Sequence, residues 1–138
     1  MILSSTTTHA LRALVFLASH EEEGSAVQAR ELARKANIPP HYMSKVLATL
    51  TRAGVLAASR GVHGGYRLAR PPAKVRLADV VLPFEGARAL PGCLLFPARR
   101  CGNKGGCSAH GAWGELKAAY ARFLESTTLA DIMGRRDE

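Results

Sequence analysis

The sequence has few cysteines and no long apolar run. No apolar stretch approaches the roughly 20 residues that a membrane helix needs. The first residues also lack the basic segment and apolar core of a signal peptide. The chain has three cysteines, an odd number that argues against a disulfide framework. We therefore expect a cytoplasmic protein with reduced thiols and no membrane partner.

Acidic residues are scarce in the middle of the chain. The whole sequence of 138 residues has a formal charge of +8 and is 47% hydrophobic, which suits one domain with a real core and perhaps one projecting element. The segment from Arg30 to Arg76 contains a single acid, Glu31, against ten bases: Arg30, Arg34, Lys35, Lys45, Arg52, Arg60, Arg67, Arg70, Lys74 and Arg76. Such a block indicates a polyanionic partner, either nucleic acid or an acidic membrane surface.

The apolar spacing predicts two helices in the first third of the chain. Residues 7–20 carry one inner stripe, and residues 29–36 form a shorter helix with its own apolar face. The expected stripe of the first helix is Leu11, Leu14, Val15 and Ala18. Asn37 suits the end of the second helix because Asn tolerates the left-handed conformation.

A third helix and a hairpin are expected next. Pro40 is well placed to begin the helix, which extends to about residue 53. Its inner stripe is Met43, Val46, Leu47 and Leu50. Residues 55–59 and 66–69 read as two strands joined by a glycine-rich turn.

The last part of the chain combines a short helix, an aperiodic loop and a long helix. Residues 77–84 form the short helix, and residues 86–111 show no period. The long helix covers residues 112–126 and carries a wide apolar face: Trp113, Leu116, Tyr120, Phe123, Leu124 and Thr127. The fold class is therefore mainly α with a small β-hairpin wing. We divide the chain into a winged helix-turn-helix at 1–85, a cysteine-rich loop at 86–111, and a dimerisation helix and tail at 112–138.

A short helix, a tight turn, an amphipathic helix and a basic hairpin together are typical of a winged helix-turn-helix. The major groove of DNA admits one helix, whose outer face touches the base edges. The residues expected to contact DNA from this helix are His41, Tyr42, Ser44 and Lys45. Those expected from the hairpin are Arg60, His63 and Arg67, since a glycine-backed arginine suits a narrow minor groove. The alternative is an ordinary three-helix core whose hairpin charges serve solubility.

The three cysteines all lie in the aperiodic loop. Cys93, Cys101 and Cys107 follow the pattern C-x7-C-x5-C, and His110 comes shortly after. Thiolate and imidazole ligands select zinc, copper(I) or iron–sulfur clusters. Structural zinc usually needs closer cysteine pairs, whereas wide spacings in a glycine-rich loop suit a cluster. The alternatives are stray or buried thiols for the cysteines, and a polar helix-start residue for His110.

Three motifs resemble the Rrf2 family of bacterial repressors, which includes IscR, NsrR and RirA. They are Arg60-Gly61-x-x-Gly64-Gly65-Tyr66-x-Leu68-Ala69-Arg70, the cysteine triplet, and Thr127-Thr128-Leu129-Ala130-Asp131. The resemblance covers nearly the whole chain. It implies a homodimer built on the long helix, a palindromic promoter site in double-stranded DNA, and a [2Fe–2S] or [4Fe–4S] iron–sulfur cluster. The implied cluster ligands are Cys93, Cys101, Cys107 and, as in IscR-like members, His110.

Two departures from the family pattern affect the cluster. The first cysteine gap is longer than in well-known members, and Thr8 stands where an NsrR-like branch has an acidic ligand, with His9 beside it. We therefore expect a cluster-controlled repressor with an IscR-like ligand set. Two rival functions are a winged-helix regulator with a zinc or redox-thiol site, and an iron–sulfur electron-transfer protein. No nucleophile paired with a base stands out, so we do not expect an enzyme.

Overall fold

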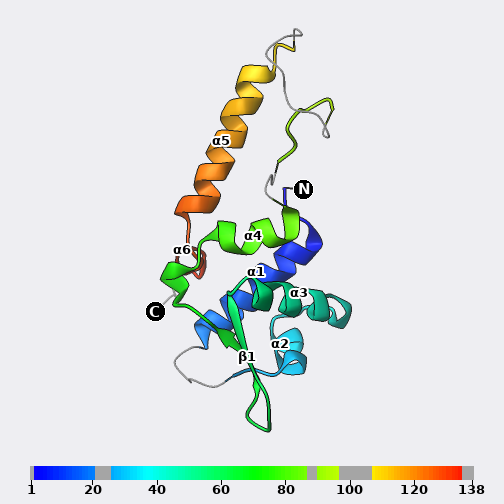
Figure 1. The fold of residues 1–138 in the computed structure, drawn as a ribbon, viewed down its shortest axis with the longest axis vertical. Helices are drawn as coiled ribbons and strands as arrows, with labels where there is room; N and C mark the ends of the chain where they lie inside the picture. The colour runs from blue at the N-terminus through cyan, green and yellow to red at the C-terminus, as the bar shows by residue number, and fades with distance from the viewer. Residues whose placement is uncertain (1, 21–25, 87–89, 97–106, 135–138) are drawn as a thin grey trace.

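The computed structural model describes residues 2–20, 26–86, 90–96 and 107–134. The helices gather into a head from which a two-stranded hairpin projects at one end and the long helix α5 at the other (Figure 1). The expected fold class, mainly α with a hairpin wing, is confirmed. Within the described ranges, no helix is both long and apolar enough to cross a bilayer.

Helix α1 (Ser5–Ser19) lies at the centre of the head. Ser4 caps its first turn, because the Ser4 hydroxyl accepts a hydrogen bond from the backbone N–H of Thr7 at 3.2 Å. Its buried residues are Thr7, Ala10, Ala13, Leu14, Leu17 and Ala18. Leu11 and Val15, which we expected inside, are only half-buried. The buried stripe contains small alanines, which let α1 pack closely on its neighbours.

Helices α2 (Ala29–Lys35) and α3 (Pro40–Arg52) form the predicted helix-turn-helix. Asn37 between them has a φ of +54°, which confirms the left-handed turn expected there. The four residues of the expected α3 stripe, Met43, Val46, Leu47 and Leu50, are all buried. They join α1 and α2 in one core with Leu14 and Leu32.

Strands β1 (Leu56–Ser59) and β2 (Gly65–Leu68) form the antiparallel wing, in which Leu56 pairs with Leu68 and Ser59 with Gly65. The short 3-10 turn η2 (Pro72–Lys74) leads to α4 (Leu77–Glu85). Pro83 falls in the last turn of α4. The helix ends at Glu85, one residue beyond the predicted end at Phe84.

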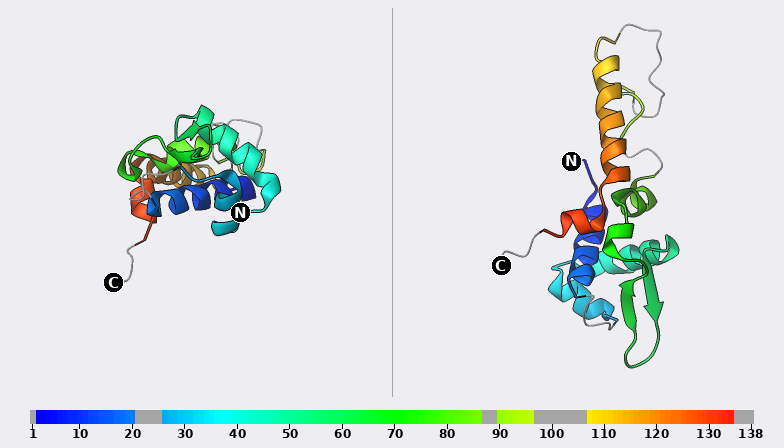
Figure 2. Two further views of the ribbon diagram at one scale, coloured as in Figure 1. Left: turned by 90° about the horizontal axis from the view of Figure 1, so that it is seen from below. Right: turned by 90° about the vertical axis from the view of Figure 1, so that its left-hand side faces the viewer.

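Helix α5 (His110–Ser126) begins two residues earlier than predicted and stands away from the head (Figures 1 and 2). A short helix, α6 (Leu129–Ile132), then folds back, and the fully buried Leu129 joins the core of α1. The sequence reasoning did not predict α6. Thr128 caps it, since the Thr128 hydroxyl accepts from the backbone N–H of Asp131 at 3.3 Å.

The wide apolar face expected on α5 is covered only in part within the subunit. Leu124 is buried in a second core with Leu77, Ala78 and Val81 of α4, against which Tyr120 packs. Leu116 and Phe123, in contrast, are 54% and 50% exposed. Part of the expected apolar face is therefore left uncovered by the subunit.

Candidate DNA-binding face and cysteine loop

Helix α3 exposes three of the four side chains that we expected to face outward. His41, Ser44 and Lys45 are exposed. Tyr42 is half-buried and packs against the core, with its ring centroid 4.4 Å from that of His9 on α1. It lies one turn before Val46 of the inner stripe, so its ring turns toward α1 rather than toward solvent. Tyr42 is thus less open to a partner than we predicted.

The histidine that packs against Tyr42, His9, lies in surroundings that favour its neutral form. Burial lowers the pKa of His9, and the nearby charges of Arg12 and His41 lower it further. Its Nδ1 atom is buried without a hydrogen-bond partner among the described residues. His9 therefore acts in this subunit as a packing residue between α1 and α3.

The hairpin exposes all three side chains predicted from its sequence: Arg60, His63 and Arg67. At the tip, Val62 is 88% exposed. A cation beside an uncovered apolar side chain at the end of a projecting hairpin suits insertion into a groove of DNA.

Two glycines lie where the turn of the wing meets strand β2. A Cβ on Gly64 would lie 2.5 Å from the Ser59 carbonyl oxygen, and a Cβ on Gly65, whose φ is +144°, would lie 2.4 Å from the Val27 carbonyl oxygen. A side chain at Gly64 would collide with the backbone of the turn, and one at Gly65 would collide with the backbone at Val27. The close approach lets Tyr66 and Val27 exchange backbone hydrogen bonds of 2.8 and 2.9 Å, which tie the wing to the segment before α2.

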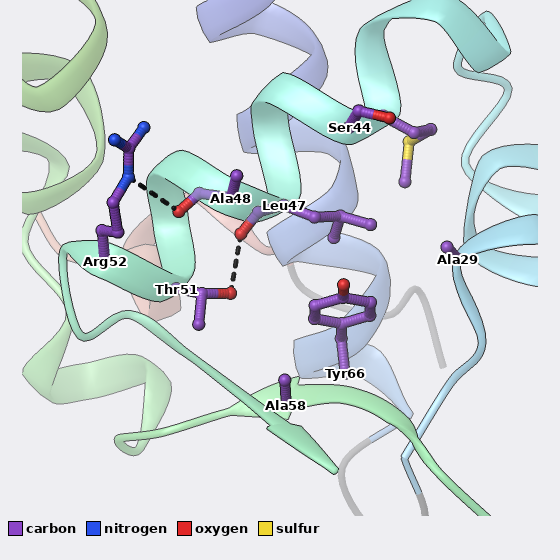
Figure 3. Close-up of a pocket in the computed structure, with 9 residues that line it drawn as sticks. Ala29, Ser44, Leu47, Ala48, Thr51, Arg52, Ala58 and Tyr66 are labelled. Atoms are coloured by element: carbon purple, nitrogen blue, oxygen red, sulfur yellow. Dashed lines mark hydrogen bonds between the residues drawn. The ribbon is translucent and has the colours of Figure 1, made fainter. Parts of the chain in front are cut away.

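A groove runs between α3 and the wing (Figure 3). Ser44, Ala48 and Arg52 follow one another along α3, while Ala58 and Tyr66 line it from the hairpin. The Arg52 Nε atom donates to the Ala48 carbonyl oxygen at 3.4 Å. Our sequence reasoning missed Ala48 and Arg52, although their spacing of four and eight residues from Ser44 places them on the same helix face. These small and polar side chains form an open surface beside the predicted recognition residues.

The basic block is less uniform than its composition suggests. Lys35 pairs with Glu31 at 3.1 Å, and both Arg70 and Arg76 pair with Asp79, at 3.5 and 3.0 Å. Arg76 also pairs with Glu125 of α5. Seven of the ten bases therefore remain for a polyanion, making no ion pair with any described residue.

The ion pairs of Arg76 connect the head to α5. Burial alone would raise the pKa of Asp79, but hydrogen bonds from Arg76 and the charges of Arg76 and Arg70 lower it overall. A backbone bridge also links Arg76 to Thr128, and the Leu77 N–H donates to the Thr127 carbonyl oxygen at 2.9 Å. The start of α4 and the end of α5 are therefore joined by both charge and backbone contacts.

The cysteine loop is described only in part. Cys93 is half-buried, Cys107 is exposed, and the backbone N–H of His110 donates to the Cys107 carbonyl oxygen at 3.2 Å. Cys101 lies outside the described residues. Among those that are described, no three His, Cys, Asp or Glu side chains come together to hold a metal.

The segment before Cys93 lies along α5, as Figure 1 shows for the yellow-green chain beside the helix. The Trp113 Nε1 atom donates to the Pro91 carbonyl oxygen at 3.2 Å, and the Lys117 ammonium donates to the Gly92 carbonyl oxygen at 2.9 Å. The sequence reasoning missed both contacts. Cys93 therefore follows directly on a segment that is bound to the N-terminal half of α5, the helix that begins at His110.

The geometry of a helix-turn-helix with a wing agrees with a comparison to known families. The family model named Rrf2, described as an iron-dependent transcriptional regulator, matches residues 3–135. The chain belongs to the Rrf2 family. It is a DNA-binding transcriptional regulator, and the expectation that it is not an enzyme is confirmed by its relatives.

Individual relatives span almost the whole chain. The regulator NsrR of Geobacillus kaustophilus is 32% identical over 136 residues, covering 99% of this chain and 92% of its own. The structure of IscR from T. potens is 25% identical, with a TM-score of 0.74 and coverage of 95% and 85%. CymR, the global cysteine regulator of B. subtilis, shares the fold, with a TM-score of 0.79, 22% identity and 98% coverage of both chains.

Proposed function

We propose that this Rrf2 regulator is a repressor whose affinity for its operator depends on an iron–sulfur cluster. The observation that carries the proposal is the placement of two chemically different regions on one framework. Helix α3 and the wing, with their exposed basic side chains, lie at one end, and α5 projects from the other end with the described loop segment 90–96 beside it (Figure 1). Because α5 leaves the head beside α4, a change at the loop reaches the DNA-binding end through packed helices.

The DNA contacts divide between two elements. Helix α3 enters the major groove with His41, Ser44 and Lys45 toward the bases, and half-buried Tyr42 contributes only its exposed edge. Arg60, His63 and Arg67 carry the wing along the backbone and into the adjacent minor groove. A regulator of this kind acts where the chromosome is, in the cytoplasm.

A homodimer on α5 matches a palindromic operator. Ala112, Leu116, Ala119 and Phe123 are exposed and fall at spacings of four, three and four residues. This spacing forms one continuous stripe on a helix, as in a coiled-coil seam, and its alanines permit close approach. A second copy of α5 would cover the stripe and set the distance between the two α3 helices. In this arrangement the units 1–85, 86–111 and 112–138 serve DNA binding, sensing and dimerisation.

The donors of the loop suit an iron–sulfur cluster. Cys93, Cys101 and Cys107 would supply three thiolates and His110 the fourth ligand, a set that iron–sulfur centres accept. Cys93 follows the segment that α5 binds, Cys107 precedes the first turn of α5, and Cys107 is open to solvent. When bound, the cluster supplies a centre that responds to oxidants, nitric oxide or iron supply. A coupling of roughly 1–3 kcal/mol between the loop and the operator is sufficient for regulation.

A second candidate is a regulator that senses thiol chemistry or zinc without a cluster. The exposed Cys107 is accessible to oxidants, and CymR, which shares the fold, is the global cysteine regulator of B. subtilis. In that case the same loop would respond through a thiol or a colourless metal ion.

Anaerobic purification of the full chain distinguishes the two candidates. A cluster protein is coloured, contains iron and sulfide, and has a characteristic Mössbauer spectrum, which also separates [2Fe–2S] from [4Fe–4S]. Titration of operator DNA before and after cluster removal then measures the coupling. Colourless protein with unchanged operator affinity would favour the thiol or zinc candidate, whereas coloured protein without DNA affinity would favour electron transfer.

A further inference from the structure

Helix α5 makes two side-chain contacts with the backbone that immediately precedes Cys93. Trp113 binds the Pro91 carbonyl and Lys117 binds the Gly92 carbonyl, at 3.2 and 2.9 Å. We propose that Trp113 and Lys117, which we call the α5 clasp, are positioning residues that hold Cys93 against α5 and couple this thiol to the long helix.

The two hydrogen bonds of the clasp depend on the helical spacing of their donors and on a bend in the loop that carries their acceptors. Trp113 and Lys117 are one turn apart and therefore project from the same face of α5. Successive carbonyls of an extended chain point in opposite directions, but the chain bends at Gly92. Both carbonyls thus reach one helix face. Gly92 is buried there, so the backbone next to Cys93 has a defined place.

The two donors differ in strength and chemistry. An ammonium group binding a carbonyl forms a charge-assisted hydrogen bond, which is stronger than one from a neutral indole. Lys117 also places a positive charge one residue from Cys93, where it would offset the negative charge of a thiolate-ligated cluster. Trp113 contributes a rigid ring that packs as well as donates. The clasp therefore combines an electrostatic contact with a steric one.

The first test needs no cluster and uses the full-length apo protein. Iodoacetamide alkylation followed by mass spectrometry gives separate rates for Cys93 and Cys107. Lys117→Met keeps the alkyl stem but removes the donor, and Trp113→Phe keeps an aromatic ring but removes the N–H. We expect each to raise the Cys93 rate relative to the Cys107 rate by roughly threefold to tenfold, since losing such a hydrogen bond frees the segment.

Two further variants separate the clasp from a general loss of charge or helix stability. Arg122→Met removes an exposed cation of the same helix and should leave the rate ratio unchanged. Lys117→Arg keeps a charged donor and should restore most of the protection. An unchanged ratio in both Lys117→Met and Trp113→Phe would overturn the proposal, as would an equal rise in Arg122→Met.

The second test rests on the proposed function. In anaerobically purified protein, a chelator should remove the cluster several times faster from Lys117→Met than from Arg122→Met or the parent. If the parent carries no cluster, the proposed cofactor is wrong, while the alkylation result still decides the clasp. If the cluster forms and all variants lose it at the same rate, the clasp does not position a ligand.

Discussion

Three arginines of the basic block have quite different surroundings, and their roles follow from them. Arg60 stands exposed at the wing tip, and Arg34 is exposed on α2. Arg76 is held by Asp79 and Glu125, and these contacts raise its pKa. We propose that Arg60 enters a groove of the DNA and that Arg34 contacts a phosphate, whereas Arg76 makes an internal contact between helices.

At the wing, we expect Arg60→Ala to weaken operator binding most where the flanking sequence is rich in A·T. A narrow minor groove has an enhanced negative potential that favours an inserted arginine. Fluorescence anisotropy with A·T-rich and G·C-rich flanks measures the difference, with exposed Lys74→Ala as the control for charge. Equal losses on both flanks would mean that Arg60 contacts only phosphates.

On α3, replacing Ser44 should change which operator is preferred, whereas Arg34→Ala should weaken all operators alike. Ser44 faces the groove beside the recognition residues, and base contacts specify sequence while phosphate contacts fix position. A wrong base pair typically costs about 1–3 kcal/mol. Selection of binding sites from a random DNA library tests this. An unchanged consensus after varying Ser44 and Lys45 together would contradict the assignment of α3.

Glu85 is expected to make stability depend on acid pH. Hydrogen bonds from the Thr7 hydroxyl (2.6 Å) and the Ser4 backbone N–H (2.9 Å) lower the pKa of Glu85 from 4.5. The lowered value means that the carboxylate stabilises the fold above pH 4.5, and that this stabilisation is lost as the pH falls further.

The variant Glu85→Gln should reduce the free energy of unfolding at pH 7 by about 1 kcal/mol and flatten its decrease below pH 4.5. Urea unfolding between pH 3 and 7 measures both quantities. Exposed Glu115→Gln on α5 is the matched control. A variant with the same acid dependence as the parent would exclude Glu85 as the titrating group.

At the scale of elements, the loop between α4 and α5 supplies the cysteines, and these two helices flank the loop on either side. Cys93 follows a segment bound by α5, and Cys107 precedes its first turn. A ligand on each side of the loop means that forming a cluster would constrain both ends of the loop.

We expect Cys93→Ala, Cys101→Ala and Cys107→Ala each to give essentially colourless protein after anaerobic purification. His110→Ala should instead form a more labile cluster with shifted absorbance, because another ligand can replace one imidazole. Exposed Ser108→Ala is the control within the same loop. A normal cluster in any cysteine variant would refute the three-cysteine site, and an unaltered His110 variant would make His110 structural.

At the scale of the whole molecule, α5 has two faces with different partners. Tyr120 and Leu124 pack on α4 within the subunit, while Leu116 and Phe123 are left half exposed. An apolar stripe of this kind is stable in water when a second chain covers it. The proposed dimer would therefore determine the spacing of the two DNA-binding faces.

We expect Leu116→Asp to give a monomer with greatly reduced affinity for a palindromic operator. An aspartate in the centre of the stripe would have to be buried without a partner. Ala121→Asp, also exposed on α5 but outside the stripe, controls for the change in charge and helix propensity. Sedimentation velocity reports the assembly state. A dimer that persists in Leu116→Asp would require a different interface.

Much of the DNA-binding head was predictable from the sequence because its signals are local. The stripe from Met43 to Leu50, the turn at Asn37 and the helix start at Pro40 depend on periodicity and on backbone preferences of single residues. The glycines of the hairpin likewise predicted a turn. What the local pattern could not supply was the reason for Gly65, which is the close approach of Val27 from a distant part of the chain.

Contacts between distant segments were decided only by the tertiary structure. From composition alone, Arg70 and Arg76 belong to the cations available for DNA. In the fold, however, Arg70 forms an ion pair with Asp79, and Arg76 forms one with Glu125. Periodicity found the apolar residues of α5, but it could not say which of them α4 covers and which remain for a second copy. The contact of Tyr42 with His9 of α1 and the contact of Lys117 with the Gly92 carbonyl were likewise decided only by the tertiary structure. A helical repeat records which side chains share a face, whereas burial and pairing depend on which other segment packs there.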